Sequence, residues 1–173
     1  MSLGTWEDLL ELDRRLTVRI RVAERPGLLR RLAALLAHSG DSWFWLLGLG
    51  LLWWRGSDFW RGWAVALVIG IAVTAAVVMA TKLLVRRRRP EGEWGRFYRE
   101  TDPHSFPSGH AARAFMLAVL ALDLGPGWLA AVLWVWAPLV ALARAAMGVH
   151  YLSDVLAGVL LGLVMGAGLA RLF

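Results

Sequence analysis

The side chains best suited to chemistry in this sequence are a histidine and an aspartate four residues apart, His150 and Asp154. On a helical turn this spacing places both on one face, where the carboxylate can hold one ring nitrogen of the imidazole. An imidazole oriented in this way presents its other nitrogen as a base or a nucleophile. A lone His–Asp pair is more often a structural hydrogen bond, so its meaning depends on the residues that accompany it.

A second polar group, Pro107-Ser108-Gly109-His110, precedes an apolar run. A proline beside serine and glycine predicts a helix start, with the backbone N–H groups of Ser108 and Gly109 pointing off the helix end. These groups and the helix dipole suit a phosphate-sized anion. Simple helix capping is the alternative. His110 favours the anion site, because a cap needs no imidazole one turn into a helix that faces lipid.

Basic residues form the third group. Lys82 is followed by the run Arg86 to Arg89, and Arg144 precedes the His–Asp pair. Such clusters are common as stop-transfer signals, and they also supply the cations that a phosphate needs. Ionisable groups at membrane depth are energetically expensive and usually mark function. A purely structural role is harder to accept for all three polar groups together than for any one of them.

The composition indicates that these residues belong to a membrane protein. Hydrophobic residues make up 58% of the 173 residues and charged residues 18%, against about 45–50% and about 25% in soluble domains. The apolar residues form blocks, often flanked by tryptophans, and we expect about five crossings, over residues 43–54, 59–85, 107–123, 128–142 and 152–171. The prediction is an all-α polytopic bundle in one domain, with a catalytic core over 41–173. Five crossings place the loop 86–106 and the junction 143–153, and hence all three polar groups, on one membrane face.

Residues 1–40 are predicted to be an amphipathic segment lying at the membrane interface, which the stretch Ser39-Gly40-Asp41-Ser42 breaks and caps. We expect no cleavable signal peptide, because the charged N-terminus lacks an apolar region. The absence of cysteine excludes disulfides and thiol catalysis. The net charge of +6 comes from arginines beside membrane segments. Anionic lipids or phosphorylated substrates are therefore the expected partners, rather than nucleic acid.

Together the three groups resemble the motifs of the type-2 phosphatidic acid phosphatase superfamily, which includes bacterial lipid phosphatases and, more distantly, vanadium haloperoxidases. Residues 82–90 fit K-x6-R-P, residues 107–110 read P-S-G-H, and residues 144–154 fit R-x5-H-x3-D. The sequence departs from the family at Ala143, where a serine is usual. One hydroxyl contact to phosphate, worth about 0.5–1.5 kcal/mol, is therefore missing, and we expect altered efficiency or substrate preference.

The resemblance implies a lipid phosphatase that needs no metal or other cofactor. His150, oriented by Asp154, would attack phosphorus and form a phosphohistidine, while His110 would protonate the leaving oxygen and then activate water. The phosphate oxygens would be bound by Lys82, Arg89, Arg144 and the backbone N–H groups of Ser108 and Gly109.

Alternatives remain open at this stage. A zinc site built from His104, His110, His150 and Asp154 is disfavoured because the surrounding cations suit an anion better; His104 and His38 otherwise receive no role. A vanadate-dependent peroxidase and a protein that binds or moves anionic lipids without hydrolysis are the other functions considered. Candidate substrates are polyprenyl diphosphates, phosphatidylglycerophosphate, phosphatidic acid and prenyl-linked sugar phosphates. The resemblance implies a bacterial inner-membrane protein. The arginine-rich N-terminus favours a cytoplasmic site, whereas a membrane crossing by residues 28–40 would place the site on the outer side, where many bacterial relatives work. The sequence leaves the oligomeric state open, a homo-oligomer included.

Overall fold

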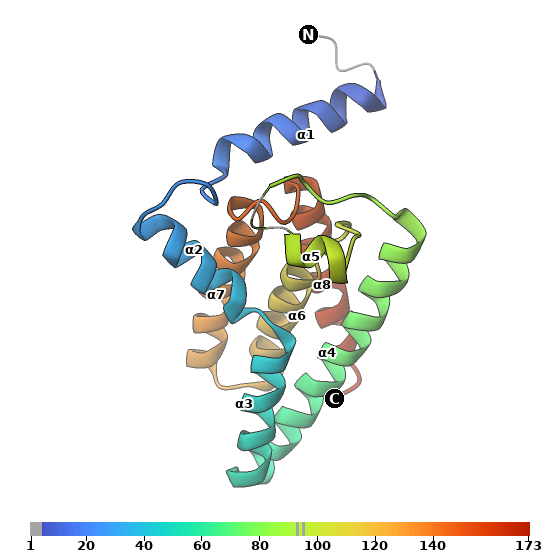
Figure 1. The fold of residues 1–173 in the computed structure, drawn as a ribbon. Coiled ribbons are helices and arrows are strands. Elements are labelled where there is room, and N and C mark those ends of the chain that lie inside the picture. The colour runs from blue at the N-terminus through green and yellow to red at the C-terminus, as the bar shows by residue number, and fades with distance from the viewer. Residues whose placement is uncertain (1–4, 93, 95) are drawn as a thin grey trace.

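The structure is a computed structural model that describes residues 5–92, 94 and 96–173, and all regular elements in this part of the chain are helices. In chain order they are α1 (Trp6–Ile20), α2 (Leu28–Ser39), α3 (Ser42–Arg55), α4 (Asp58–Val85), α5 (Arg96–Thr101), α6 (Gly109–Leu124), α7 (Gly127–Ala146) and α8 (Leu152–Ala170). The long helices run up and down as a bundle, with α1 beyond one end of it (Figure 1). The predicted all-α class is confirmed.

Helix α6 is the centre of the bundle. Every residue from Ala111 to Ala121 is buried, and the helix packs against α4, α7 and α8. The expectation that this helix faces lipid is therefore wrong. Because neighbouring helices enclose it, α6 can be short and can carry a charged side chain, Arg113, in its interior.

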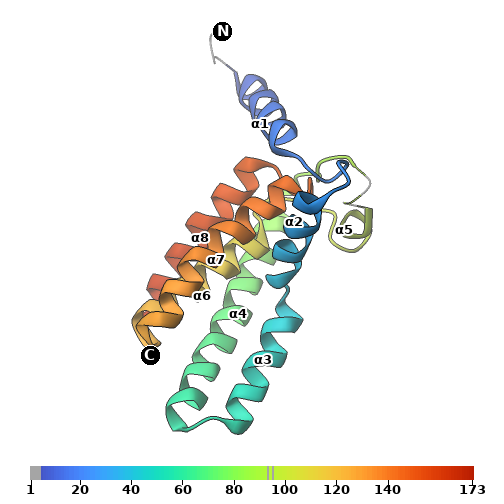
Figure 2. The same ribbon diagram turned by 90° about the vertical axis from the view of Figure 1, so that its left-hand side faces the viewer.

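Three helices, α4, α7 and α8, are long and apolar enough to cross a membrane. The other two expected crossings, α3 and α6, have 14 and 16 residues, which is about 21 and 24 Å of helix. Figure 2 shows α6, α7 and α8 side by side, with α3 and α4 forming a hairpin beside them. The chain is a membrane protein whose outward face on α8, lined by Leu156, Leu160 and Val164, is apolar and exposed.

The opposite face of α8 consists of glycines at every fourth position. Gly158, Gly162 and Gly166 are buried, and they face α6. A Cβ atom at Gly162 would lie 2.3 Å from the carbonyl oxygen of Ala112. The absence of side chains therefore lets the two helix backbones approach closely, as small residues do between membrane helices. This packing fixes the start of α6 against the start of α8.

Helices α1 and α2 lie at the end of the bundle where α4 and α7 end and α6 and α8 begin (Figure 1). Helix α1 opens with a reciprocal capping box between Thr5 and Asp8. Helix α2 packs Ala33 and Ala37 against the end of α7. An interfacial position for residues 1–40 remains a prediction.

Candidate active site

The residues expected to do chemistry gather at the end of the bundle beneath α1, although they come from five separate segments. A cavity of about 870 Å³ opens there. Its charged and polar lining includes Lys82 from the end of α4, Arg89 from the following loop, Gly109 and His110 from the start of α6, Arg144 from the end of α7, and His150 before α8. Ser108 and Asp154 are fully buried and do not line the cavity.

His150 is buried, and the hydrogen bonds at both of its ring nitrogens are defined. Nδ1 lies 2.8 Å from the carbonyl oxygen of Ser105, which can only accept, so Nδ1 carries the proton. Nε2 then presents its lone pair to the guanidinium of Arg89, 3.2 Å away. Burial lowers the pKa of His150 to about 3, and the cations of Arg89 and Arg144 act in the same direction. The imidazole is therefore neutral at physiological pH, and Nε2 carries no proton.

Asp154 does not hold this ring as the sequence suggested. Its Oδ2 lies 3.8 Å from Nδ1 of His150, which is within ion-pair range but too long for a hydrogen bond. The carboxylate instead accepts from Arg87 at 2.7 Å and from the backbone N–H of Tyr151 at 2.8 Å. The carbonyl oxygen of Ser105 lies closer to Nδ1 than the carboxylate of Asp154 does, and its hydrogen bond replaces the expected one.

The loop that carries Ser105 is held in place by the basic run. The backbone of Arg88 pairs with His104 in an isolated antiparallel bridge, and the N–H of Ser105 donates to the carbonyl of Arg87 at 2.8 Å. The Ser105 hydroxyl donates to the carbonyl of Arg88. These bonds fix the carbonyl that orients His150. The backbone of Arg87 and Arg88 therefore has a structural role in addition to following the end of a membrane helix.

Lys82 and Arg89, two of the three cations expected to bind phosphate, are buried and partly neutralised. Lys82 and Arg89 both pair with the carboxylate of Asp102, and Arg89 makes a 2.7 Å contact with it. Partial burial would raise the pKa of Asp102, but the hydrogen bond and charge of Lys82, aided by Arg89, lower it. A phosphate that binds to these two cations must compete with this carboxylate. Sequence reasoning missed Asp102, because nothing in its spacing connects it to Lys82.

Ser108 acts as a helix cap rather than as a phosphate ligand. Its hydroxyl accepts the N–H of Ala111, and its own N–H donates to the carbonyl of Asp154 at 2.9 Å. The expectation that this N–H binds phosphate is therefore contradicted. The close approach at Gly158 brings α8 near enough to take the bond. Gly109 lines the cavity, so binding of phosphate by its N–H remains a prediction.

His110 meets a partner that the sequence analysis did not identify. Its Nε2 lies 2.7 Å from Oδ1 of Asp41, in the turn between α2 and α3. Asp41 stands at the N-terminal cap position of α3, but its side chain makes no capping hydrogen bond. The expected role of the 39–42 stretch as a break between helices is confirmed. The carboxylate of Asp41, however, pairs with His110 instead of capping α3.

Family membership is decided by comparison with known proteins. The model of the PAP2 superfamily matches residues 63–173, and this span contains all three motifs. The chain belongs to the PAP2 superfamily. Helices α1 to α3, and with them Asp13 and Asp41, lie outside the matched span.

Two curated relatives of this PAP2 protein are lipid phosphatases. It is 36% identical over 154 residues to the decaprenylphosphoryl-5-phosphoribose phosphatase of Mycobacterium tuberculosis, covering 87% of this chain and 83% of that protein. It is 32% identical over 113 residues to the lipid A 1-phosphatase of Porphyromonas gingivalis, covering 64% of this chain and 24% of the other. The chain is accordingly a membrane phosphatase that hydrolyses phosphoric esters of lipids.

Two solved structures share the fold. A transmembrane PAP2-type phosphatidylglycerolphosphate phosphatase from Bacillus subtilis superposes with a TM-score of 0.75 at 22% identity, covering 99% of this chain and 88% of that chain. Aquifex aeolicus LpxE gives a TM-score of 0.72 at 26% identity, covering 94% of each chain. The first comparison supports the fold alone.

The departure of this PAP2 protein from the family pattern has a local structural setting. Ala143 is buried in a small apolar cluster with Ala33 and Ala37 of α2 and with Met147. A methyl group suits this contact, because α2 approaches α7 closely there. Of the two histidines without an expected role, His104 does not line the cavity and His38 does. Within the described ranges, no group of three or more His, Cys, Asp or Glu side chains could hold a metal ion.

Helix α1 is joined to the catalytic motif through Arg87. The guanidinium bridges Asp13 of α1 and Asp154 of α8 at 2.7 Å each. Asp13 also accepts the backbone N–H of Ser153 at 3.0 Å, and Thr17 accepts that of Leu152 at 3.0 Å. Two side chains of α1 thus satisfy free N–H groups at the start of α8.

Replacing Asp13 with asparagine is expected to destabilise the PAP2 fold by about 1.5–3 kcal/mol, because it removes the charge that Arg87 and Ser153 share. The melting temperature in detergent should fall by roughly 5 °C. Glu7→Gln, which removes an exposed carboxylate from the same helix, is the matched control and should leave it unchanged. Equal melting temperatures for the two variants would show that the bridge contributes no stability.

Proposed function

We propose that this enzyme removes the terminal phosphate from a polyprenyl-linked sugar phosphate, of the phosphoribose class on which its mycobacterial relative is named to act. One observation carries the chemistry: a neutral, buried imidazole directs Nε2 at the cations of the cavity, 3.2 Å from Arg89. The substrate class is supported by the 36% identity, which extends over 87% of the chain.

The walls of the cavity support a lipid-linked sugar. Beyond the charged cluster, its lining turns apolar along α4, at Ile71, Ala75, Val78 and Met79, and two tryptophans, Trp43 and Trp94, flank it. Tryptophan faces pack well against sugar rings because they combine a large apolar surface with little conformational freedom. We place the sugar between the tryptophans and the cations.

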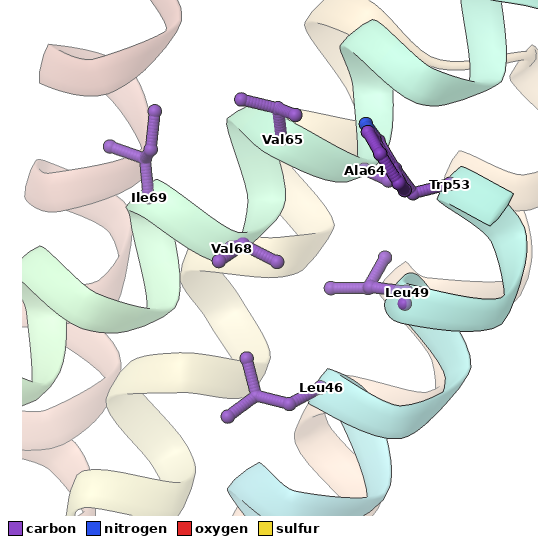
Figure 3. Close-up of a pocket in the computed structure, with 8 residues that line it drawn as sticks. Leu46, Leu49, Trp53, Ala64, Val65, Val68 and Ile69 are labelled. Atoms are coloured by element: carbon purple, nitrogen blue, oxygen red, sulfur yellow. The ribbon is translucent and has the colours of Figure 1, made fainter.

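The hydrocarbon chain has an apolar path towards the bilayer. A second pocket, of about 370 Å³, lies between α3 and α4 (Figure 3). Figure 3 shows Leu46 and Leu49 of α3 extending towards Val68 of α4, and Val65 and Ile69 of α4 also line this pocket. On both helices this pocket begins within a few residues of the cavity lining, at Trp43 and Ile71. We assign this seam to the prenyl chain.

The proposed reaction has two balanced steps. Nε2 of His150 forms a bond to phosphorus while the bond from phosphorus to the sugar oxygen breaks, and His110 gives its proton to that oxygen. Water then attacks the phosphohistidine, His110 takes the proton of the water, and the P–N bond breaks to release phosphate. Lys82, Arg89, Arg144 and the N–H of Gly109 offset the charge of the transition state.

We further propose that the site faces the cytoplasm of a bacterial cell, in the inner membrane. The many arginines of α1 and α2 lie at the same end of the bundle as the cavity, and basic residues mark cytoplasmic segments. A cytoplasmic site suits a prenyl-linked sugar phosphate better than an exported prenyl diphosphate.

A substrate panel tests this function. Purified enzyme in detergent, with chelator present, should release phosphate from a polyprenyl-phosphoribose phosphate with a kcat/KM at least about 10-fold above those for phosphatidylglycerophosphate, phosphatidic acid and a polyprenyl diphosphate. A tenfold ratio corresponds to about 1.4 kcal/mol of transition-state binding, as one buried hydrogen-bonded group supplies. A preference for another lipid would overturn the substrate class. Tight binding of all four lipids without phosphate release would overturn the hydrolytic function.

A further inference from the structure

The contact between Asp41 and His110 joins two parts of the chain that are 69 residues apart. The carboxylate accepts from Nε2 of His110 at 2.7 Å, and its other oxygen lies 3.2 Å from Nδ1 of His38. Partial burial would raise the pKa of Asp41, but these two histidine contacts lower it to about 2. Asp41 is therefore ionised at any pH at which the enzyme works.

The turn that carries Asp41 is fixed to the bundle on both sides. Arg113, one turn along α6 from His110, donates to the carbonyl of Gly40 through Nε at 2.9 Å and also binds the hydroxyl of Ser42. Trp136 of α7 donates to the hydroxyl of Ser39 at 2.9 Å. A Cβ atom at Gly40 would lie 3.2 Å from Cδ2 of His110. The turn and the ring are thus held against each other.

The charges around the ring explain why such a partner is needed. A general acid has to carry a proton, and neighbouring cations disfavour the charged imidazole. The other charged or titratable groups of this region are His38 of α2, Lys82 of α4, Arg89 and Asp102 of the loop, Arg113 of α6, Arg144 of α7, and His150. Asp102 is already paired with Lys82 and Arg89, which leaves Asp41 as the anion in contact with His110.

We propose that Asp41 is the positioning residue of the general acid–base: its carboxylate fixes the ring of His110 and keeps a proton on it within a cationic cavity. The inference rests on the role of His110 in the proposed function. Because the carboxylate holds the proton on Nε2, the proton exchanged with the leaving oxygen and with water is the one on Nδ1. Asp41 lines the same cavity, and in this proposal it acts through His110 rather than on the substrate.

The test is Asp41→Asn in the full-length enzyme. An amide can donate to an unprotonated Nε2, so the substitution favours the neutral imidazole. With the lipid substrate, kcat should fall about 100-fold with little change in KM. The alkaline limb of the pH–rate profile should move to lower pH by about one unit. With a nitrophenyl phosphate, whose leaving group needs no proton, the loss should be less than about threefold. Asp41→Glu should restore part of the lipid rate.

Two controls separate this role from a structural one. Asp58→Asn removes a fully exposed carboxylate from the first turn of α4 and should change none of these values. In the His110→Asn background, adding Asp41→Asn should cause no further loss, because the two residues act as one unit. Equal losses with both leaving groups, an unmoved pH profile or additive losses would overturn the proposal. A wild-type enzyme without phosphatase activity would instead overturn the proposed function.

Discussion

Replacing His150 with glutamine should reduce phosphate release by about 10⁴-fold or more, the scale on which loss of a nucleophile acts in covalent hydrolases. Glutamine retains polarity but lacks a ring nitrogen that can form a phosphoenzyme. In the wild type, burial lowers the pKa of His150 to about 3. The imidazole is therefore neutral, and Nε2 unprotonated, throughout the working pH range. The side chain is 1% exposed, so the substitution acts inside the cavity and not at the surface.

The measurement is phosphate release at saturating substrate, together with trapping of labelled phosphate on the enzyme. Wild type should give a label that is lost in acid and kept in alkali, as expected of a phosphoramidate, and His150→Gln should give none. His104→Gln, which changes a histidine side chain outside the cavity, should retain the label and the rate. A His150→Gln enzyme that still forms the phosphoenzyme would exclude this nucleophile.

Replacing Gly162 with leucine should destabilise the fold by at least about 3 kcal/mol, at the upper end of the range for overpacking. The Cβ atom alone would lie 2.3 Å from the carbonyl oxygen of Ala112 and 3.0 Å from Cβ of Phe115. Backbone cannot move aside as a flexible side chain does, so α6 and α8 have to separate. The same helices carry His110 and Asp154, and activity should fall with stability.

Unfolding by denaturing detergent, followed by tryptophan fluorescence, measures this effect. Gly168→Ala is the matched control on the same helix, because nothing lies within 4 Å of its added Cβ. It should be neutral or stabilising by up to about 1 kcal/mol, since alanine favours helix. A Gly162→Leu protein as stable as this control would show that the glycine face does not bring the two helices together.

Much of the fold followed from local patterns. Apolar blocks with flanking tryptophans predicted the helices, and the even alternation of their direction placed the polar groups at one end. The geometry agrees, with Lys82, His110, Arg144 and His150 around a single cavity. Arg113 is a local signal for the turn that carries Asp41: it stands inside an apolar helix, where an ionisable group is energetically expensive, and it donates to the carbonyl of Gly40 in that turn.

The sequence by itself determined that the protein lies in a membrane, where its helices run and which side chains form the site. Hydrophobic blocks and motif spacing are sufficient for this, because they depend only on residues that are near one another in the chain. Only the tertiary structure decided which partner each group takes. Nδ1 of His150 donates to the carbonyl of Ser105 rather than to Asp154. The N–H of Ser108 donates to a carbonyl of α8, and Asp41, 69 residues away in sequence, forms a hydrogen bond with His110. Hydrogen bonds extend only about 3 Å, and buried groups must find a partner within that distance. The distance between packed helices, which residues such as Gly158 set, therefore decides which acceptor each donor binds, and the spacing of residues in the sequence does not distinguish these acceptors.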